Sequence, residues 1–361
     1  MMKVLGIVFY NRSGSMLVSS MLDSHPSILT LPPYILNGFY SFWRNEVEDQ
    51  DSFSNVLNKF CYYFATLFDV YGGNSDLYSR IDAPQVMNLC SFNSGKGMTV
   101  SEKNFKESLS GFFLDFKERG FSNRASFLLS LHVSFENLYL GREWKSADDG
   151  LCACQLHSPD QVYLLDFLED FPNAKILHVI RNPIISLGSH IKHYINEYGF
   201  NEEYLYGMLR QMLYSGTPIN GDYDSIKGFK FEQLHAEPEL TMRRVAEWLE
   251  IDWHPILLKS TFGGEPWVYI NNGEKISGLG NVAANRSHND FFSDHDKAVL
   301  SYLTRDKMLA WGYPYIEKKV ELPDIFDFEK IVVGYRSARI SNLIGFVKDN
   351  FDILPKPVRL I

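Results

Sequence analysis

The sequence predicts an α/β fold built around a central parallel sheet. Residues 3–10 (KVLGIVFY) and 174–180 (AKILHVI) are short apolar runs of the kind that form buried strands in such sheets. Each run is followed by a polar turn and then by the start of a predicted helix. We therefore expect a single α/β domain with a helical insertion and a C-terminal appendage.

The composition excludes several classes of protein. The 361 residues suffice for two domains or for one large α/β domain, and 25 Gly and 15 Pro argue against disordered or collagen-like architecture. Lys and Arg total 35 against 44 Asp and Glu, which gives a formal net charge of −9. Because nonspecific nucleic-acid binding favours a basic surface, we expect no nucleic-acid partner. Any anionic ligand has to be held by a few placed cations.

The four cysteines are too few and too scattered for a disulfide framework. Cys152 and Cys154 flank one alanine, so a strand would place both thiols on one face. No second Cys or His pair stands at a spacing typical of zinc sites. We expect both to be buried as small apolar groups, with no metal bound.

The N-terminal segment does not predict a secretory signal, because the apolar residues after Lys3 are few and no cleavage-type site follows them. No apolar run approaches the roughly 18 residues of a transmembrane helix. These observations predict a cytoplasmic protein without a transmembrane segment.

The turn after the first predicted strand has the composition of an anion-binding loop. Asn11-Arg12-Ser13-Gly14-Ser15 precedes a predicted helix over residues 16–22. Backbone N–H groups at such a helix start, with serine hydroxyls and one Arg, suit a phosphate-type anion. An ordinary turn with a serine cap is the alternative. No Lys follows Gly14 as in a nucleotide-hydrolysing loop, and no G-x-G-x-x-G is present, so the loop suits an anion that needs no metal.

A second candidate anion site lies about 170 residues further on. A predicted helix over residues 161–171 leads into the strand at 174–180, which ends at Arg181. Pro183 is well placed as the first residue of another helix, and Ser189 lies two turns into it. Open α/β sheets bind ligands at the carboxyl ends of their strands, so Arg181 and Ser189 could clamp an anion. A structural salt bridge is the alternative for Arg181.

Four ordered blocks carry a family resemblance. The first two are Asn11-Arg12-Ser13-Gly14-Ser15 with Leu22-Asp23-Ser24-His25-Pro26, and Phe171-Pro172-Asn173-Ala174-Lys175 with Arg181-Asn182-Pro183 and Ser189. The other two are residues 229–234 with Glu237-Pro238 and Trp248-Leu249, and residues 275–278 with Arg286 and Trp311-Gly312-Tyr313. Together they resemble sulfotransferases that use 3′-phosphoadenosine 5′-phosphosulfate (PAPS), whose 5′-phosphosulfate loop and 3′-phosphate segment match the first two blocks.

The resemblance implies a P-loop-type three-layer fold and an enzyme that moves a sulfuryl group from PAPS to a hydroxyl, less readily an amine. The acceptor class stays open between small molecules, lipids and carbohydrates, and the nucleotide product is PAP. The implied 5′-phosphosulfate contacts are Arg12, Ser13, Gly14, Ser15 and Met16. The implied 3′-phosphate contacts are Arg181, Ser189 and Arg286. The resemblance requires no metal.

Two positions depart from the family pattern. The Lys that usually bridges the leaving oxygen and the sulfonate is replaced by His157, which could donate a proton when charged or accept one when neutral. We expect Arg12 and His157 to be catalytic, with a hydrogen-bonded core histidine as the alternative for His157. The usual Glu after the "HP" segment is replaced by Tyr34, so His157 or a residue of the insertion would supply the base, or the machinery is altered. A non-catalytic binding protein with this fold and a P-loop kinase are the alternative functions.

Two further segments complete the expected architecture. Within the domain over residues 1–315, an insertion over 39–150 has predicted helices at 101–118 and 122–140 and is rich in aromatic residues. It is expected to form a cap over the acceptor, with plain core packing as the alternative. The appendage, residues 316–361, has an amphipathic stretch at 339–349 whose alternatives are docking on the core, a homodimer contact or membrane attachment.

Overall fold

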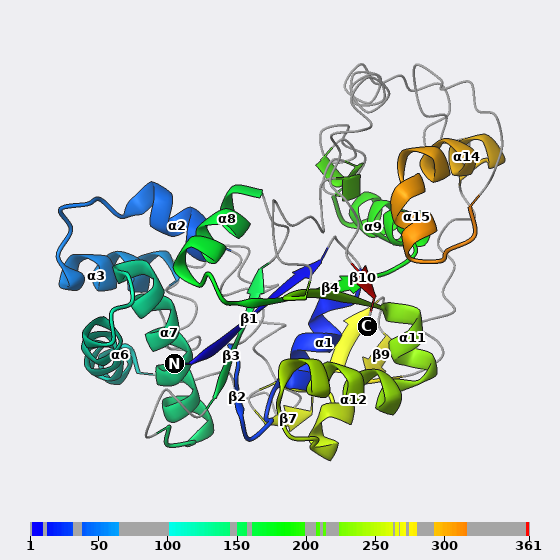
Figure 1. Cartoon of the computed structure of the whole chain (residues 1–361). Coiled ribbons are helices and arrows are strands. Elements are labelled where there is room, and N and C mark those ends of the chain that lie inside the picture. Colours follow the sequence, from blue (N-terminus) through cyan, green and yellow to red (C-terminus); the bar gives the residue numbers. More distant parts are fainter. Residues whose placement is uncertain are drawn as a thin grey trace.

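The protein is described by a computed structural model. It covers residues 2–9, 13–31, 38–64, 101–144, 150–156, 161–198, 207–209, 212–213, 224–262, 264–266, 268–271, 274–279, 292–315 and 359–360. Within these residues the fold is α/β with a central parallel sheet, as the sequence predicts (Figure 1).

Six strands form the central sheet, and every neighbouring pair is parallel. In sheet order they are β10 (Arg359–Leu360), β5 (Ile226–Lys230), β4 (Lys175–Ile180), β1 (Lys3–Phe9), β3 (Leu151–Leu156) and β2 (Ile28–Leu29). The first predicted strand, β1, is therefore central, and the second, β4, is its direct neighbour. Both strand predictions are confirmed.

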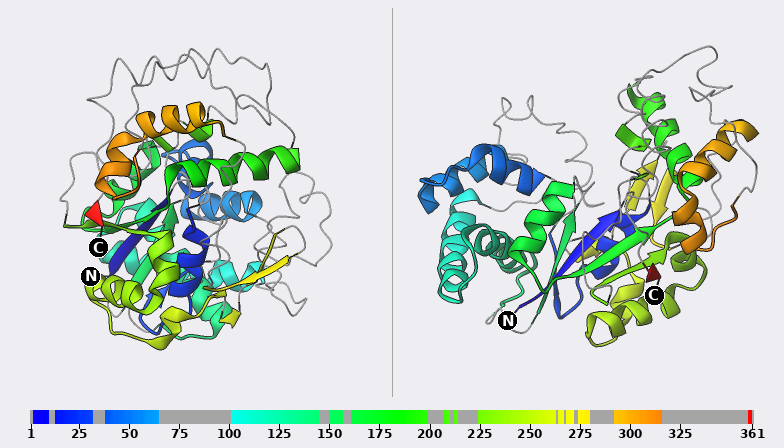
Figure 2. Two further views of the ribbon diagram at one scale, coloured as in Figure 1. Left: turned by 90° about the vertical axis from the view of Figure 1, so that its right-hand side faces the viewer. Right: turned by 45° about the horizontal axis from the view of Figure 1, so that its top comes forward.

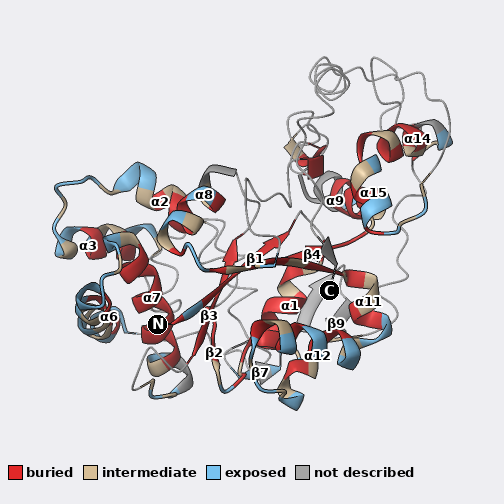
Figure 3. Cartoon of the chain, in the orientation of Figure 1, coloured by how far each residue is buried: buried red, intermediate tan, exposed pale blue. Residues whose placement is uncertain are grey.

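Side chains of β1 alternate between the two faces of the sheet. Leu5 and Ile7 belong to one core cluster, and Val4 and Val8 belong to the other. All four side chains are buried, because helices cover both faces (Figure 3). Two buried faces explain why the strand has a continuous apolar sequence rather than an alternating one. The architecture has three layers.

One face is covered by α1 (Ser15–Leu22), α11 (Phe231–Ala236), α12 (Pro238–Leu249) and the short 3₁₀ helix η5 (Pro255–Leu258). The opposite face carries the larger set of helices, which also form its extended core cluster. They are α2 (Phe39–Glu46), α3 (Phe53–Tyr63), α6 (Glu102–Glu118), α7 (Asn123–Phe135), α8 (Gln161–Asp170), α9 (Pro183–Tyr198), α14 (Asp294–Leu303) and α15 (Arg305–Ala310). Helices α2, α3, α6 and α7 gather at one side of the sheet, apart from α9, α14 and α15 (Figure 2).

Small antiparallel pairs lie outside the central sheet. They are β6 (Thr261–Phe262) with β7 (Glu265–Pro266), and β8 (Val268–Asn271) with β9 (Glu274–Ser277). The segment over residues 22–26 leads toward the first of these pairs. Asp23 accepts hydrogen bonds from Thr30 Oγ1 at 2.9 Å, Thr261 Oγ1 at 2.9 Å and the Gly264 N–H at 3.1 Å. This segment therefore ties the end of α1 to β6 and β7.

The insertion is helical in its described parts, and its aromatic residues pack against one another. Phe42 and Phe60 are fully buried, and the rings of Phe53 and Phe113 stack with centroids 4.1 Å apart. Helix α7 begins where predicted but ends in a single π turn, Glu136–Leu140, before Gly141 in the left-handed region. For the described rings, core packing is thus the better of the two interpretations made from the sequence.

Most of the appendage lies outside the described residues, including the amphipathic stretch at 339–349. Its last described residues form β10, which pairs with Lys227 and Gly228 of β5 and so extends the central sheet. Among the described helices, none combines the length and apolar character needed to cross a membrane.

Candidate functional site

Four parallel strands end at the same edge of the sheet. The register places Phe9 of β1 beside Val179 of β4, and Val8 beside Leu156 of β3. Ile180 of β4 likewise pairs with Lys230 of β5. The segments that follow these strands therefore meet at one carboxyl edge, which is where open α/β sheets bind ligands.

The turn after β1 is shaped around Gly14. Its φ of 97° lies in the left-handed region, and a Cβ on this residue would come within 2.2 Å of the Phe231 ring. Only glycine satisfies both conditions at low cost. The loop backbone therefore lies directly against the start of α11.

The start of α1 can receive an anion. No side chain among the described residues caps this helix, and its first turn contains no acidic residue. The hydroxyl of Ser13 is buried and has no hydrogen-bond partner within the described structure. Uncapped N–H groups and a buried, unsatisfied hydroxyl are what an anion at this position would satisfy.

Gln155 is a residue of this region that the sequence interpretation missed. It is the penultimate residue of β3, and its Nε2 lies 3.5 Å from Ser15 Oγ and 3.6 Å from Met16 Sδ. Its Oε1 is buried and has no partner within the described structure. The available signal was its position two residues before His157, near the end of an apolar run.

Arg181 lies against the Phe231 ring, which also contacts the loop at Gly14. It directly follows β4 and is 6% exposed, and its guanidinium carbon lies 4.9 Å from the centroid of Phe231. Gly14 and Arg181, 167 positions apart in the sequence, therefore both lie against Phe231. The structure thus brings the two predicted anion motifs to a common neighbour.

The segment after Arg181 is held in place by hydrogen bonds. Asn182 Oδ1 accepts from the N–H groups of Ile184 and Ile185, at 3.0 and 3.2 Å, and so caps α9. The Asn182 N–H donates to Glu232 Oε1 at 3.1 Å, and Tyr313 donates its hydroxyl to Glu232 Oε2 at 2.7 Å. Helix α9 begins at Pro183 as predicted, which puts the buried Ser189 two turns further along.

Several predicted site residues lie outside the described part of the chain. They are Arg12, Tyr34, His157 and Arg286. Among the residues assigned to nucleotide binding, the structure describes Ser13, Gly14, Ser15, Met16, Arg181 and Ser189. Their roles as nucleotide contacts stay predictions.

Part of the chain matches a known protein family. A sequence model described as "Sulfotransferase family" matches residues 84–255. This range includes Gln155, Arg181, Ser189 and Phe231 but not the loop after β1. No curated protein matches the chain.

Solved structures that resemble the chain include three sulfotransferases. The sulfotransferase domain from the Synechococcus PCC 7002 olefin synthase is 14% identical, covers 89% of this chain and 90% of its own, and has a TM-score of 0.36. The sulfotransferase domain from the curacin biosynthetic pathway is 14% identical, covers 90% and 99%, and has a TM-score of 0.37. Sulfotransferase STF9 from Mycobacterium avium is 14% identical, covers 71% and 66%, and has a TM-score of 0.35.

The family match and the predicted order of strands, turns and helices agree on the segment that carries β3, β4 and β5. The expected family resemblance is confirmed: residues 84–255, slightly less than half of the chain, match the sulfotransferase family.

Proposed function

We propose that the protein transfers a sulfuryl group from PAPS to a hydroxyl, less readily an amine, of a small-molecule, lipid or carbohydrate acceptor. The observation that carries the proposal is the approach of the loop at Gly14 and of Arg181 to the same Phe231 ring. A nucleotide with phosphates at both ends of its ribose needs two separate groups of donors close together. The domain over residues 1–315 would supply them.

The residues at the loop fit the 5′ end of this nucleotide. Ser13, Gly14, Ser15 and Met16, together with Arg12, would surround the phosphosulfate with N–H groups, hydroxyls and one cation. The buried hydroxyl of Ser13 and the uncapped start of α1 would gain the partners that they lack. Arg181, Ser189 and Arg286 would hold the 3′-phosphate.

When bound, PAPS supplies the sulfuryl group, and PAP is the second product. In the transfer, an acceptor oxygen forms a bond to sulfur, the bond from sulfur to the bridging phosphate oxygen breaks, and the acceptor proton passes to a base. Donors preorganised around the bridging oxygen stabilise the charge that develops there. We assign the base to His157, with Arg12 as the cation at the leaving oxygen. The insertion over 39–150 would contribute to the acceptor pocket.

The first test compares two nucleotides by calorimetry. We expect the protein to bind PAP and to show no binding of ATP with Mg²⁺. Binding of ATP–Mg²⁺ without binding of PAP would indicate a kinase instead. If PAP binds but labelled sulfate is transferred to no acceptor in a broad panel, and PAPS itself is not consumed, the protein is a non-catalytic binder with this fold.

The second test addresses the 3′-phosphate. Arg181→Ala should weaken PAP binding about 10- to 100-fold, because a charge-assisted contact contributes about 1.5–3 kcal/mol. Adenosine 5′-phosphosulfate lacks the 3′-phosphate, so its affinity should change little. The exposed Arg243, which pairs with Glu239, provides the matched control Arg243→Ala. Equal losses for the two nucleotides contradict the assignment of Arg181.

His157 is tested by substitution in the active enzyme. His157→Ala should lower kcat strongly while PAP affinity changes little. Unchanged turnover would show that another group accepts the proton.

A further inference from the structure

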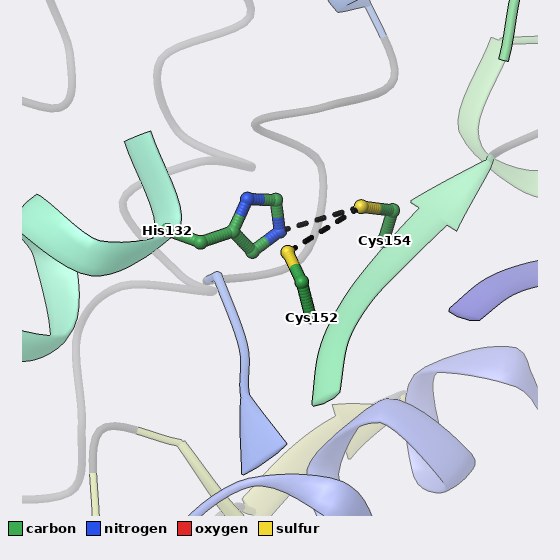
Figure 4. Close-up of side chains that lie close together, drawn as sticks. All are labelled: His132, Cys152 and Cys154. Carbon is green, nitrogen blue, oxygen red and sulfur yellow. Dashed lines mark hydrogen bonds between the residues drawn. The ribbon is translucent and has the colours of Figure 1, made fainter. Parts of the chain in front are cut away.

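A second polar centre lies away from the strand-end site, in the core between α7 and β3. His132 projects from α7 toward Cys152 and Cys154 of β3 (Figure 4). All three side chains are fully buried. The two sulfur atoms are 3.9 Å apart, and Cys154 Sγ lies 3.7 Å from His132 Nε2. One ligand atom from each residue lies within 4.8 Å of the other two. This set is called the Cys–His cluster below.

The orientation of the imidazole is set by its other nitrogen. His132 Nδ1 lies 2.8 Å from the carbonyl oxygen of Leu128. A carbonyl oxygen only accepts, so Nδ1 carries a proton and donates it there. In the neutral ring, Nε2 then has a lone pair directed at the sulfur atoms. A ring N–H bonded to a backbone carbonyl is the usual support of a histidine that ligates a metal.

Two of the three separations between the ligand atoms are close to those in a coordination shell. Bonds of about 2.3 Å to sulfur and 2.0–2.1 Å to nitrogen, at tetrahedral angles, separate neighbouring ligand atoms by roughly 3.5–3.8 Å. The observed separations of 3.9 and 3.7 Å are close to these values. Neutral thiols form only weak hydrogen bonds. Hydrogen bonding by itself therefore gives little reason for two thiols and an imidazole to converge.

One acidic side chain lies close to the cluster in the sequence. Glu136, one turn beyond His132, is already paired with Arg142 at 2.6 Å. It is therefore not free to balance a further charge in the cluster.

We propose that His132, Cys152 and Cys154 bind one thiophilic d¹⁰ metal ion at the interface of the insertion and the sheet. Soft thiolates with an imidazole select Zn²⁺ or Cu⁺. Two thiolates neutralise Zn²⁺ but leave a net charge of −1 around Cu⁺, and a buried uncompensated charge is costly. Zn²⁺ is therefore the expected ion. Binding replaces the two thiol protons, which pass to solvent, and involves no redox change.

The site is independent of the proposed sulfuryl transfer. Cys152 and Cys154 belong to the core cluster on the insertion side of the sheet, whereas neighbouring Leu151 and Ala153 belong to the opposite one. Since the ligands are fully buried, the ion has to enter while the insertion folds onto the sheet or during local opening. Its role is structural.

The test measures the metal content of the full chain. The protein is produced in medium that contains both metals, purified without chelator under anaerobic conditions, unfolded and analysed by mass spectrometry of its metals. We expect about one Zn per chain in the wild type and less than about a tenth of this amount in Cys152→Ser and Cys154→Ser. Cys61→Ser is the matched control, because Cys61 is also buried but lies on α3 outside the cluster. One equivalent of copper in place of zinc identifies Cu⁺ as the ion.

A second measurement keeps the proposal open to refutation if the variants fail to fold. The wild type is unfolded with a chelator, refolded with Zn²⁺, with Cu⁺ or with no metal, and assayed for bound metal and for the midpoint of unfolding. With Co²⁺ added instead, a bound ion gives thiolate-to-metal charge-transfer absorption. The proposal is overturned if the purified protein and the refolded protein both contain no metal and none of the ions changes the midpoint of unfolding.

Discussion

The two strands that flank β1, namely β3 and β4, place polar side chains at two positions along their length, and the positions differ in what surrounds them. At the carboxyl ends, Gln155 is the penultimate residue of β3 and Arg181 follows β4. In the middle of the same strands, Cys154 and His178 are fully buried. The ends adjoin a loop with uncapped N–H groups, whereas the middles are enclosed by helices.

This difference assigns the two groups to different tasks. Polar groups at the strand ends can form hydrogen bonds with a ligand, so their loss should change ligand binding more than stability. Polar groups in the middle have been removed from water, so their loss should change stability more than binding. Each prediction below tests one side of this comparison.

The largest effect is expected at Gly14, where binding and stability coincide. Gly14→Ala should cost about 3 kcal/mol of unfolding free energy, because the left-handed backbone and the contact with Phe231 are both penalised. PAP binding should fall at least tenfold because the loop moves. Chemical denaturation and calorimetry measure the two effects.

Gly120 supplies the matched control for this substitution. Its φ of 88° is also left-handed, but nothing lies within 4 Å of an added Cβ. Gly120→Ala should therefore cost only about 1 kcal/mol and leave PAP binding unchanged. In a Phe231→Ala background, the loss of unfolding free energy caused by Gly14→Ala should fall to the same value as for Gly120→Ala. If the cost of Gly14→Ala is unchanged there, the contact with the ring is not its cause.

The next effect is a pH dependence from the middle of β4. Burial, with the nearby charge of Lys307, lowers the pKa of His178 to about 3. In the unfolded chain its pKa is near 6.5, so between these values the unfolded state binds the additional proton. Stability contributed by the neutral ring is complete above pH 6.5 and is lost as the pH falls. Between pH 7 and pH 5 the loss should be about 2 kcal/mol.

His178→Leu should remove this part of the pH dependence, as measured by denaturation at several pH values. PAP affinity at pH 7 should stay the same. His254→Asn is the control, because His254 is exposed and the Asn keeps an acceptor for the Ile256 N–H. A pH profile that His178→Leu leaves unchanged contradicts the assignment.

The smallest effect is expected at Ser13. Ser13→Ala removes a buried hydroxyl that has no hydrogen-bond partner among the described residues, so the free energy of unfolding should change by less than about 1 kcal/mol. PAP affinity should fall about fivefold, which corresponds to one neutral hydrogen bond. Ser19→Ala removes another buried hydroxyl, one turn along α1, for which the described part of the chain provides no partner, and it should leave PAP affinity unchanged. If Ser13→Ala and Ser19→Ala bind PAP with equal affinity, the phosphate does not contact Ser13.

The sequence predicted much of this fold because its signals are local. The apolar runs of β1 and β4 mark strands buried on both faces, and Pro183 marks the start of α9. The loop at Gly14 and the position of Arg181 were also predicted, since each directly follows a recognisable strand. Strand order and the shared neighbour Phe231 were not, because they depend on contacts between distant segments.

The Cys–His cluster marks the limit of sequence reasoning most clearly. The spacing of Cys152 and Cys154 predicted two buried thiols on one face, and the structure confirms their burial. The sequence offered no indication of His132. This residue lies 20 positions before Cys152, which is not a spacing typical of metal ligands. Only the packing of α7 on β3 brings the imidazole to the sulfur atoms.

The sequence by itself determined the α/β class, the glycine-containing turn after β1 and the Arg at a strand end, because strand and turn preferences act within a few residues. The tertiary structure decided that the loop and Arg181 lie against one ring, that Gln155 lies beside Ser15 and Met16, and that His132 lies beside two cysteines. These contacts depend on strand order and on how helices cover each face, which follow from the packing of the whole chain.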